Sequence, residues 1–477
     1  MGNNKNLTSQ AWLADESITP IHAHSGDDRD DFLVKTNEAG CAEYISMEEA
    51  NRHAAENALS NMGITDHSPL LAGGYSRRNV LAGALSATAL GAMGAISADP
   101  KYVFNPAHAA TKHTTVIISL RGAADLSTVF TPISDPDFLK LRPSISVTEE
   151  TGLKINKHWA IHPAAKGLKE LFDAGDLWFG HGVGTPSQTR SHFESQALWD
   201  RGAPTQVRTG WAGRYLANSA GSGVFRAVSL NGSVIPVMQH SEPTLSMASM
   251  GTFSIKHDSS QYQLKNRIAS IWNSLGGSFT EDVDMALKAT STIAQIRPKV
   301  GYSNYDRADI GTPLAEVAQM IKSGIGVEMA AVDSLAVSGW DTHSLMGKVT
   351  DPQGRMYRNI LNLSRNIKAF MDDLGAHAAN TTVIVVTEFG RRGSQNGSNG
   401  LDHGRGNAMF VVGKRINSAK WTPTFPGAAE SQLEQGDFAL TQDYRNVIGT
   451  LLRKKMGFTD VSAVFPDLDF REVTSIK

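Results

Sequence analysis

Uninterrupted apolar runs recur along the chain from residue 113 onwards. The clearest is 381–387, which reads Thr-Thr-Val-Ile-Val-Val-Thr and ends at Glu388. Apolar runs without polar alternation are typical of strands that are buried on both faces of a sheet. This pattern predicts strands at 113–120, 177–184, 329–337, 381–387 and 408–412.

Other segments repeat their apolar residues with the period of a helix. In 164–174, for example, Leu168, Leu171 and Phe172 fall on one face. The same reasoning predicts further helices at 189–200, 264–275, 283–296, 313–323, 355–374 and 444–456. Between 225 and 255, short apolar runs alternate with Gly, Pro and Ser, which predicts strands and hairpins.

Strands that alternate with helices predict an α/β fold, a mostly parallel sheet sandwiched by helices. The main domain is expected at 110–477, with a helical insertion at about 256–330. Ligands of such sheets bind beyond the carboxyl ends of the strands. Side chains that follow the predicted strands are therefore the first candidates for a site.

The first hundred residues have a different character. Residues 1–75 are polar and acidic and are predicted to be a disordered leader. Residues 76–109 contain paired arginines, a weakly apolar Ala/Gly/Leu stretch and Ala107-His108-Ala109, which together are typical of a twin-arginine export signal. The expected partner is the twin-arginine translocase, and the expected location is periplasmic or extracellular. Met62 would give a leader of more usual length.

Composition narrows the classes of function. The apolar fraction of 41% is enough for a large core, and the formal net charge of −2 excludes the basic field expected of a nucleic-acid-binding protein. The stretch after the arginines is too weakly apolar for a stable membrane span, which needs about 20 strongly apolar residues. Cys41 is the single cysteine. A metal in the main domain would therefore have Asp, Glu and His ligands.

Acidic and histidine side chains follow several predicted strands. The candidate metal ligands are Asp125, Asp341, His343, Glu388, Asp402 and His403. Carboxylate oxygens and imidazole nitrogens from separate loops suit one or two divalent ions, which we expect to be zinc, calcium, magnesium or manganese. The alternative is a set of surface turns whose charges pair with one another.

Ser191 is the candidate nucleophile because it lies at the predicted start of a helix, where free backbone N–H groups favour an anionic group. With Glu194 three residues later, Ser191 also fits a capping box, and the two roles are compatible. Arg190 is the candidate partner for an anionic ligand, and Arg391 and Arg405 either share that task or balance the carboxylates. His181 and His192 are either additional ligands or loop histidines with local partners, and the second role is favoured. Five tryptophans, Trp159, Trp178, Trp199, Trp211 and Trp340, are expected in the core.

Seven motifs occur in an order that resembles a large bacterial family, domain of unknown function 1501. They are Leu120-Arg121-Gly122-Ala123-Ala124-Asp125, His162-Pro163, His181-Gly182-Val183-Gly184, Arg190-Ser191-His192-Phe193, Gly339-Trp340-Asp341-Thr342-His343, Thr387-Glu388-Phe389-Gly390-Arg391 and Asp402-His403-Gly404-Arg405. That family is similar to the alkaline phosphatase and sulfatase superfamily. The resemblance implies an alkaline-phosphatase-like fold with a metal centre at the strand ends.

The resemblance also implies roles for individual positions. Asp125 would follow the first strand, Ser191 would be the nucleophile, Asp341 and His343 would share one metal, and Glu388 and His403 would complete the centre. The superfamily usually has Asp-His where this chain has Glu388-Phe389, and it commonly has Asp-Gly where Leu126 follows Asp125. Either Asp402 compensates for the missing imidazole, or a single metal binds.

The expected function is that of an exported metal-dependent hydrolase of phosphate or sulfate esters, with a small anionic ester as substrate. The alternative is a secreted metal-binding or assembly protein that keeps the fold without turnover.

Overall fold

The computed structural model describes residues 113–477 except 188, 222, 241–243, 255–277 and 418–423, together with three short strands nearer the amino terminus. The chain divides into two compact units, Met1–Ala95 and Ile96–Lys477. In the first unit, β2 (Leu33–Thr36) pairs antiparallel with β1 (Ile18–Pro20) and with β3 (Ala42–Ile45). The rest of the predicted leader, the predicted export signal at 76–109 and the predicted helix at 264–275 lie outside the described residues.

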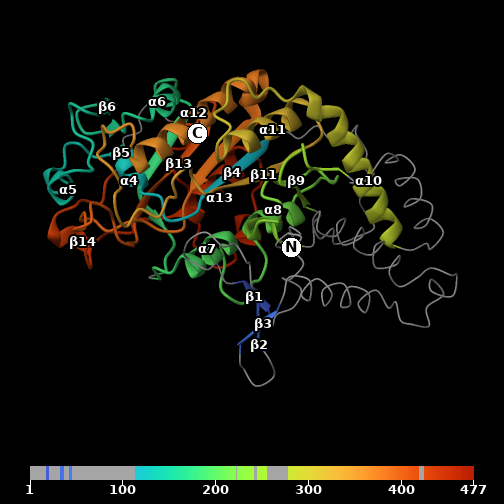
Figure 1. Cartoon of the computed structure of the whole chain (residues 1–477), viewed down its shortest axis with the longest axis horizontal. Helices are drawn as coiled ribbons and strands as arrows, with labels where there is room; N and C mark the ends of the chain where they lie inside the picture. Colours follow the sequence, from blue (N-terminus) through green and yellow to red (C-terminus); the bar gives the residue numbers. More distant parts are fainter. Residues whose placement is uncertain are drawn as a thin grey trace, which may run out of the picture. The chain divides into compact units, whose positions relative to one another are not determined.

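The second unit is built around an eight-stranded sheet of order β10-β9-β11-β4-β12-β13-β8-β16 (Figure 1). Strand β13 runs antiparallel to its neighbours β12 and β8, and the other neighbouring pairs are parallel. A mixed α/β fold with a mostly parallel sheet is therefore confirmed. The strands are β4 (Thr114–Leu120), β8 (Leu177–Gly184), β9 (Ala227–Ser229), β10 (Leu245–Ser246), β11 (Met329–Ser334), β12 (Thr381–Val386), β13 (Asn407–Gly413) and β16 (Gln442–Asp443).

Strand β4 lies in the middle of the sheet, with β11 and β12 in parallel on its two sides. Val116 stands opposite Ala330 on β11 and Val383 on β12, and all seven residues of β4 are buried. Burial on both faces explains why these strands carry continuous apolar runs. The prediction of hairpins between 225 and 255 was wrong, because β9 and β10 pair in parallel.

Helices cover both faces of this sheet (Figure 1). On one face, side chains of β4, β12 and β13 share a core cluster with residues of α7, α8, α13 and α14. On the other, α12 packs between α6 and α11, with α6 against β8 and α11 against β11. These helices are α6 (Lys166–Asp173), α7 (His192–Arg201), α8 (Trp211–Asn218), α11 (Gly311–Lys322), α12 (Arg355–Asp373), α13 (Tyr444–Lys454) and α14 (Val461–Val464). The five tryptophans expected in the core are buried there.

Smaller elements complete the unit. A three-stranded antiparallel sheet has the order β5-β7-β6, and β14 pairs with β15. The described part of the predicted insertion contains α10 and α11. The remaining elements are α4 (Leu126–Val129), β5 (Phe130–Thr131), α5 (Pro136–Leu141), β6 (Leu153–Lys154), β7 (Ala160–Ile161), η2 (Pro236–Met238), α10 (Ser278–Ile296), η3 (Arg297–Lys299), η4 (Gly375–Asn380), η5 (Glu430–Gln432), β14 (Leu433–Glu434) and β15 (Asp437–Phe438).

The parallel strands bring several loops to one edge of the sheet. Strands β4, β8, β11 and β12 all end at this edge, and β13 begins there because it runs the opposite way. The loops after β4, β8, β11 and β12 and the loop before β13 therefore meet. Among the described helices, none combines the length and apolar character needed to cross a bilayer.

Candidate metal centre

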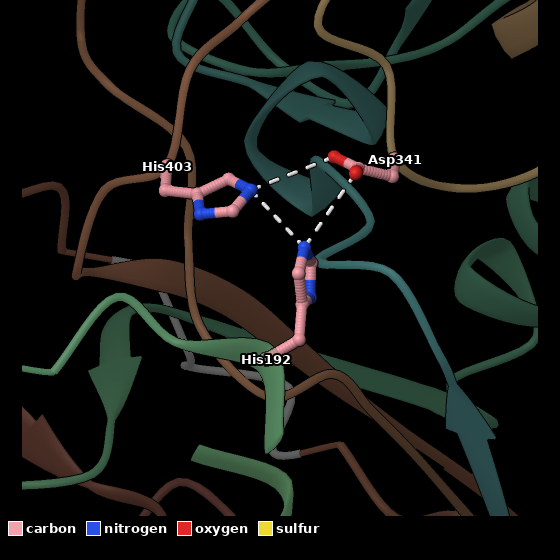
Figure 2. Close-up of side chains that lie close together, drawn as sticks. All are labelled: His192, Asp341 and His403. Carbon is pink, nitrogen blue, oxygen red and sulfur yellow. Dashed lines mark hydrogen bonds and ion pairs between the residues drawn. The ribbon is translucent and has the colours of Figure 1, made fainter. Parts of the chain in front are cut away.

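Three side chains from these loops meet beyond the sheet edge: His192, Asp341 and His403 (Figure 2). Their ligand atoms all lie within 4.8 Å of one another. The two imidazole Nε2 atoms are 3.0 Å apart, and the Asp341 carboxylate oxygens lie 3.6 Å from Nε2 of His192 and 3.7 Å from Nε2 of His403. His192 is the first residue of α7, Asp341 follows β11 and His403 precedes β13.

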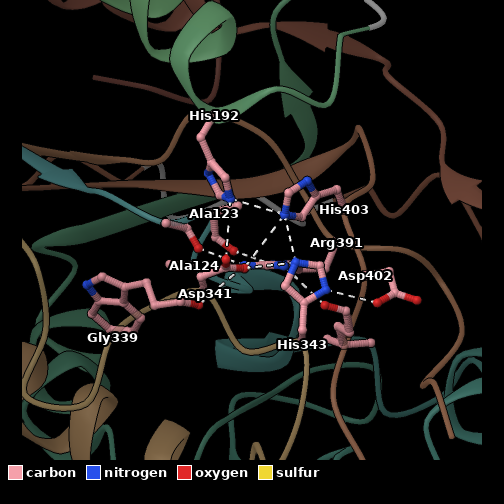
Figure 3. Close-up of polar contacts among 12 residues, drawn as sticks. Ala123, Ala124, His192, Gly339, Asp341, His343, Arg391, Asp402 and His403 are labelled. Carbon is pink, nitrogen blue, oxygen red and sulfur yellow. Dashed lines mark hydrogen bonds and ion pairs between the residues drawn. The ribbon is translucent and has the colours of Figure 1, made fainter. Parts of the chain in front are cut away.

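His343 joins this group from the same loop as Asp341 (Figure 3). Its Nε2 atom lies 2.9 Å from Nε2 of His403 and 3.2 Å from Oδ1 of Asp341. We call His192, Asp341, His343 and His403 the His/Asp cluster. Among His192, Asp341 and His403 the contacts are 3.0–3.7 Å, near the spacing of about 3.4 Å between ligands around a tetrahedral zinc ion, and His343 adds contacts of 2.9 Å to His403 and 3.2 Å to Asp341.

The hydrogen-bond partner of His403 Nδ1 shows which ring nitrogen carries the hydrogen. Nδ1 lies 2.8 Å from the backbone carbonyl oxygen of Arg190. A carbonyl only accepts hydrogen bonds, so Nδ1 carries the hydrogen and Nε2 of the neutral ring presents a lone pair to the cluster.

The other two histidines are anchored in the same way, by carboxylates. Nδ1 of His192 lies 2.7 Å from Oε1 of Glu388, and Nδ1 of His343 lies 3.0 Å from Oδ1 of Asp402. A carboxylate on the outer nitrogen is the usual support of a metal-binding histidine, since it orients the ring and makes the inner nitrogen more basic. Glu388 and Asp402 thus lie one step behind the cluster.

Lone pairs that face one another at about 3 Å repel unless a cation lies between them. In the absence of a metal, a proton takes that place: hydrogen bonds with Asp341 and Glu388 raise the pKa of His192 to about 9. Burial lowers the pKa of His403, although the Arg190 carbonyl acts in the opposite direction. Burial acts to raise the pKa of Asp341, but hydrogen bonds from His192 and Arg391 outweigh it and keep that pKa well below its usual value. The donor set therefore fits a divalent cation.

Glu388 is a buried carboxylate with several donors. Besides His192, its Oε1 atom accepts hydrogen bonds of 2.9 Å from the Gly122 backbone N–H and from the Gln196 amide. Burial raises its pKa, yet the hydrogen bonds from His192 and Gln196 prevail and lower the pKa to about 2. The Glu388 side chain is only 1% exposed, so solvent screens its interaction with His192 very little.

Arg391 supports the cluster from inside the protein. Its guanidinium is fully buried, donates to the backbone carbonyls of Gly122, Ala123 and Leu401, and donates a 2.6 Å hydrogen bond to Oδ1 of Asp341. Gly122 has a φ of 115°, and a Cβ atom there would lie 3.0 Å from the Asp341 backbone nitrogen. Of the two roles expected for Arg391, the structure shows the balancing of a carboxylate.

The remaining predicted residues are placed differently. Asp125 is buried and pairs with the buried guanidinium of Arg142 at 2.7 Å, so that carboxylate oxygen is engaged away from the His/Asp cluster. The guanidinium of Arg190 binds Asp437, and this residue reaches the cluster through its carbonyl instead. The Ser191 hydroxyl caps α7 by accepting from the Glu194 N–H at 3.5 Å.

Neither histidine is the loop residue with local partners that the sequence favoured: His181 is a buried residue of β8, and His192 is the first residue of α7. The Nε2–H group of His181 donates to the Phe130 carbonyl, and its ring lies against Trp159 in the interior. His192, by contrast, is part of the cluster. The available signal was its place directly after the predicted cap Ser191, on the segment that follows the predicted strand 177–184.

The cluster is open to solvent. The side chains of Asp341 and His343 are 44% and 45% exposed, and those of His192 and His403 are about a quarter exposed. Structural zinc sites are closed, whereas catalytic sites keep a position for water or substrate. The His/Asp cluster is exposed enough for an external ligand to reach it.

The family model of proteins of unknown function, DUF1501, matches residues 178–459, more than half of the chain. The chain belongs to this family. The match includes all four residues of the His/Asp cluster and their supports Glu388, Arg391 and Asp402. No curated protein matches the chain.

Proposed function

We propose that this DUF1501 protein is a metal-dependent hydrolase of phosphate or sulfate esters that uses one divalent cation held by the His/Asp cluster. The observation that carries the proposal is the shared orientation of three imidazoles, whose Nδ1–H groups donate outward while their Nε2 atoms converge on Asp341. A cation bound there would polarise the ester and favour the deprotonated form of an attacking hydroxyl or water.

Phe389 supports the choice of a single cation. Its ring centroid lies 4.9 Å from that of His192 and 4.9 Å from that of His403. In the sequence, Phe389 stands where the superfamily that the chain resembles usually has a second metal-binding imidazole, and this apolar ring offers a cation no ligand atom. We propose an alkaline-phosphatase-like site reduced to one metal.

The residues around the cation have distinct tasks in this proposal. Glu388 and Asp402 hold the rings of His192 and His343, and Arg391 holds the Asp341 carboxylate. Ser191 is the proposed nucleophile because it directly precedes His192 at the start of α7, where the free backbone N–H groups stabilise negative charge. Among the described residues its Oγ atom accepts a capping bond of 3.5 Å and donates none, so its hydrogen is available for transfer.

The test measures the metal content and turnover of the full chain. We expect about one equivalent of divalent metal and hydrolysis of an aryl phosphate or an aryl sulfate, both lost in His403→Ala. The matched control is His377→Ala, since His377 is an exposed histidine in η4, which leads into the amino end of β12 at the opposite edge of the sheet. A metal-free wild-type protein would overturn the proposal.

A second candidate is a secreted metal-binding or assembly protein without turnover, and Phe389 is the observation that favours it. Bound metal in the absence of hydrolysis of either ester, unchanged by Ser191→Ala, would support that function. Export by the twin-arginine route is proposed for both candidates on the basis of residues 76–109.

A further inference from the structure

Large apolar side chains are exposed at four places in the described part of the chain. They are Phe193, Leu335, Val337 and Leu345, with 87%, 69%, 47% and 72% of their surface exposed. Apolar residues scattered singly over a surface need no explanation, whereas exposed apolar residues that gather beside a candidate site are candidates for contact with its ligand. We call these four residues the apolar border.

The apolar border lies on the segments that carry the His/Asp cluster. Phe193 directly follows His192, and Leu345 lies two residues after His343. Since consecutive Cα atoms are about 3.8 Å apart, both side chains start within a few ångströms of a ligand residue. Leu335 and Val337 lie in the loop that leads from β11 to Asp341. The segments that carry the ligands of the proposed cation therefore also carry the exposed apolar side chains.

The first part of this loop is held in place by Asp309. Its Oδ1 atom accepts hydrogen bonds of 3.0 Å from the Leu335 N–H and 3.2 Å from the Ala336 N–H. Ala336 has a φ of 61°, a left-handed conformation that is costly for a residue with a Cβ atom. Leu335 and Val337 are therefore exposed on a loop whose backbone conformation is fixed by contacts with Asp309.

The second part of the loop is held by α12 and by the segment before β13. Arg355 of α12 donates to the carbonyls of Ser338 and Ser344, and the N–H group of Leu345 donates to Ser398 O at 3.0 Å. Leu345 is also left-handed, with a φ of 49°. A bulky leucine is therefore kept exposed beside His343, at a backbone angle that a glycine would adopt more easily.

We propose that the substrate is a phosphate or sulfate ester whose alcohol part is a large apolar group, with the anionic part at the His/Asp cluster and the alcohol part against the apolar border. This inference rests on the proposed function and names its substrate class. A small molecule is favoured over a protein partner, because a stable protein interface takes about 20–30 residues from each side, far more than the apolar border supplies.

The test compares alkyl esters of two to ten carbons in the form, phosphate or sulfate, that the full chain hydrolyses. We expect kcat/KM to rise with chain length, by up to about fourfold for each methylene group that becomes fully buried. In Phe193→Ser and Leu345→Ser, the loss should be at least about tenfold greater for the ten-carbon ester than for the two-carbon ester. Leu153→Ser is the control, since Leu153 is a partly exposed leucine on the separate sheet β5-β7-β6.

A second readout does not require turnover. The fluorescent probe 8-anilinonaphthalene-1-sulfonate joins an anionic group to aromatic rings, and it should bind the metal-loaded full chain more tightly than Phe193→Ser. If no ester is hydrolysed and no metal is bound, the proposed function fails. If esters are hydrolysed but kcat/KM is independent of chain length, or the probe binds Phe193→Ser equally well, only the inference about the apolar border is overturned.

Discussion

Arg391 donates a 2.6 Å hydrogen bond from its fully buried guanidinium to Oδ1 of Asp341, a carboxylate that is 44% exposed. The interaction joins an interior cation to a side chain at the opening of the His/Asp cluster. Arg391 also donates to three backbone carbonyls, so its guanidinium has little freedom to move. The direction of the Asp341 carboxylate is therefore set from inside the protein.

The first prediction concerns this pair. In Arg391→Lys, the charge is kept but the fork of donors is lost, so Asp341 loses its orientation. We expect metal affinity to fall about 10- to 100-fold, measured by competition with a fluorescent chelator. Arg392→Lys is the matched control, because Arg392 is the adjacent arginine and is 37% exposed. Equal affinities in both variants would show that Asp341 does not depend on Arg391.

The second prediction compares the two carboxylates behind the histidines. Glu388→Gln should weaken metal binding about tenfold, because an amide supports the His192 ring less strongly than a carboxylate. Asp402→Asn should have a smaller effect, since the Asp402 side chain is 51% exposed and its charge is screened by solvent. Titration of the metal-free proteins with zinc measures both. A larger effect in Asp402→Asn would contradict this ranking.

The third prediction separates the two roles of Ser191. Ser191→Ala removes both the hydroxyl nucleophile and the helix cap, whereas Ser191→Asn keeps a side chain that can cap α7. We expect both variants to bind metal and to lose turnover by at least about 100-fold. Only Ser191→Ala should lose about 1 kcal/mol of unfolding free energy in urea. Wild-type turnover by Ser191→Asn would assign the attack to water.

The fourth prediction concerns acid stability. Burial lowers the pKa of His162 to about 3 and that of His181 to about 4. Burial also lowers the pKa of His113 to about 4, with a smaller contribution from repulsion by Lys455. A histidine with a lowered pKa stays neutral in the folded protein while the unfolded chain takes up a proton. Its stabilising effect is complete above pH 6.5 and is lost as the pH falls toward 4.

Urea unfolding at several pH values checks this effect. Each of the three histidines should contribute a slope of about 1.4 kcal/mol per pH unit between pH 6 and 4.5. His181→Gln should reduce the total slope by that amount, and its slope between pH 7 and 8 should equal that of the wild type. An unchanged slope at the lower pH would show that His181 accepts a proton in the folded protein.

Sequence reasoning predicted most of the secondary structure of the main domain. The run at 381–387 is confirmed as β12 (Thr381–Val386), and the periodic segment at 355–374 is confirmed as α12 (Arg355–Asp373). Both patterns are local: a strand buried on both faces needs continuous apolar residues, and a helix on a sheet needs one apolar stripe. The parallel arrangement then led to candidates at one edge of the sheet. The short runs between 225 and 255 carried too little information to reveal a parallel pair.

What the sequence determined by itself is which residue types stand at the strand ends, because strands and their exits follow from local patterns. Only the tertiary structure decided which of these side chains meet. It assigned Asp125 to Arg142, brought His192 to the cluster and placed Glu388 and Asp402 behind the histidines. The physical reason is that a side chain's partner depends on the packing of loops far apart in the chain, and a hydrogen bond is made or lost within about 1 Å.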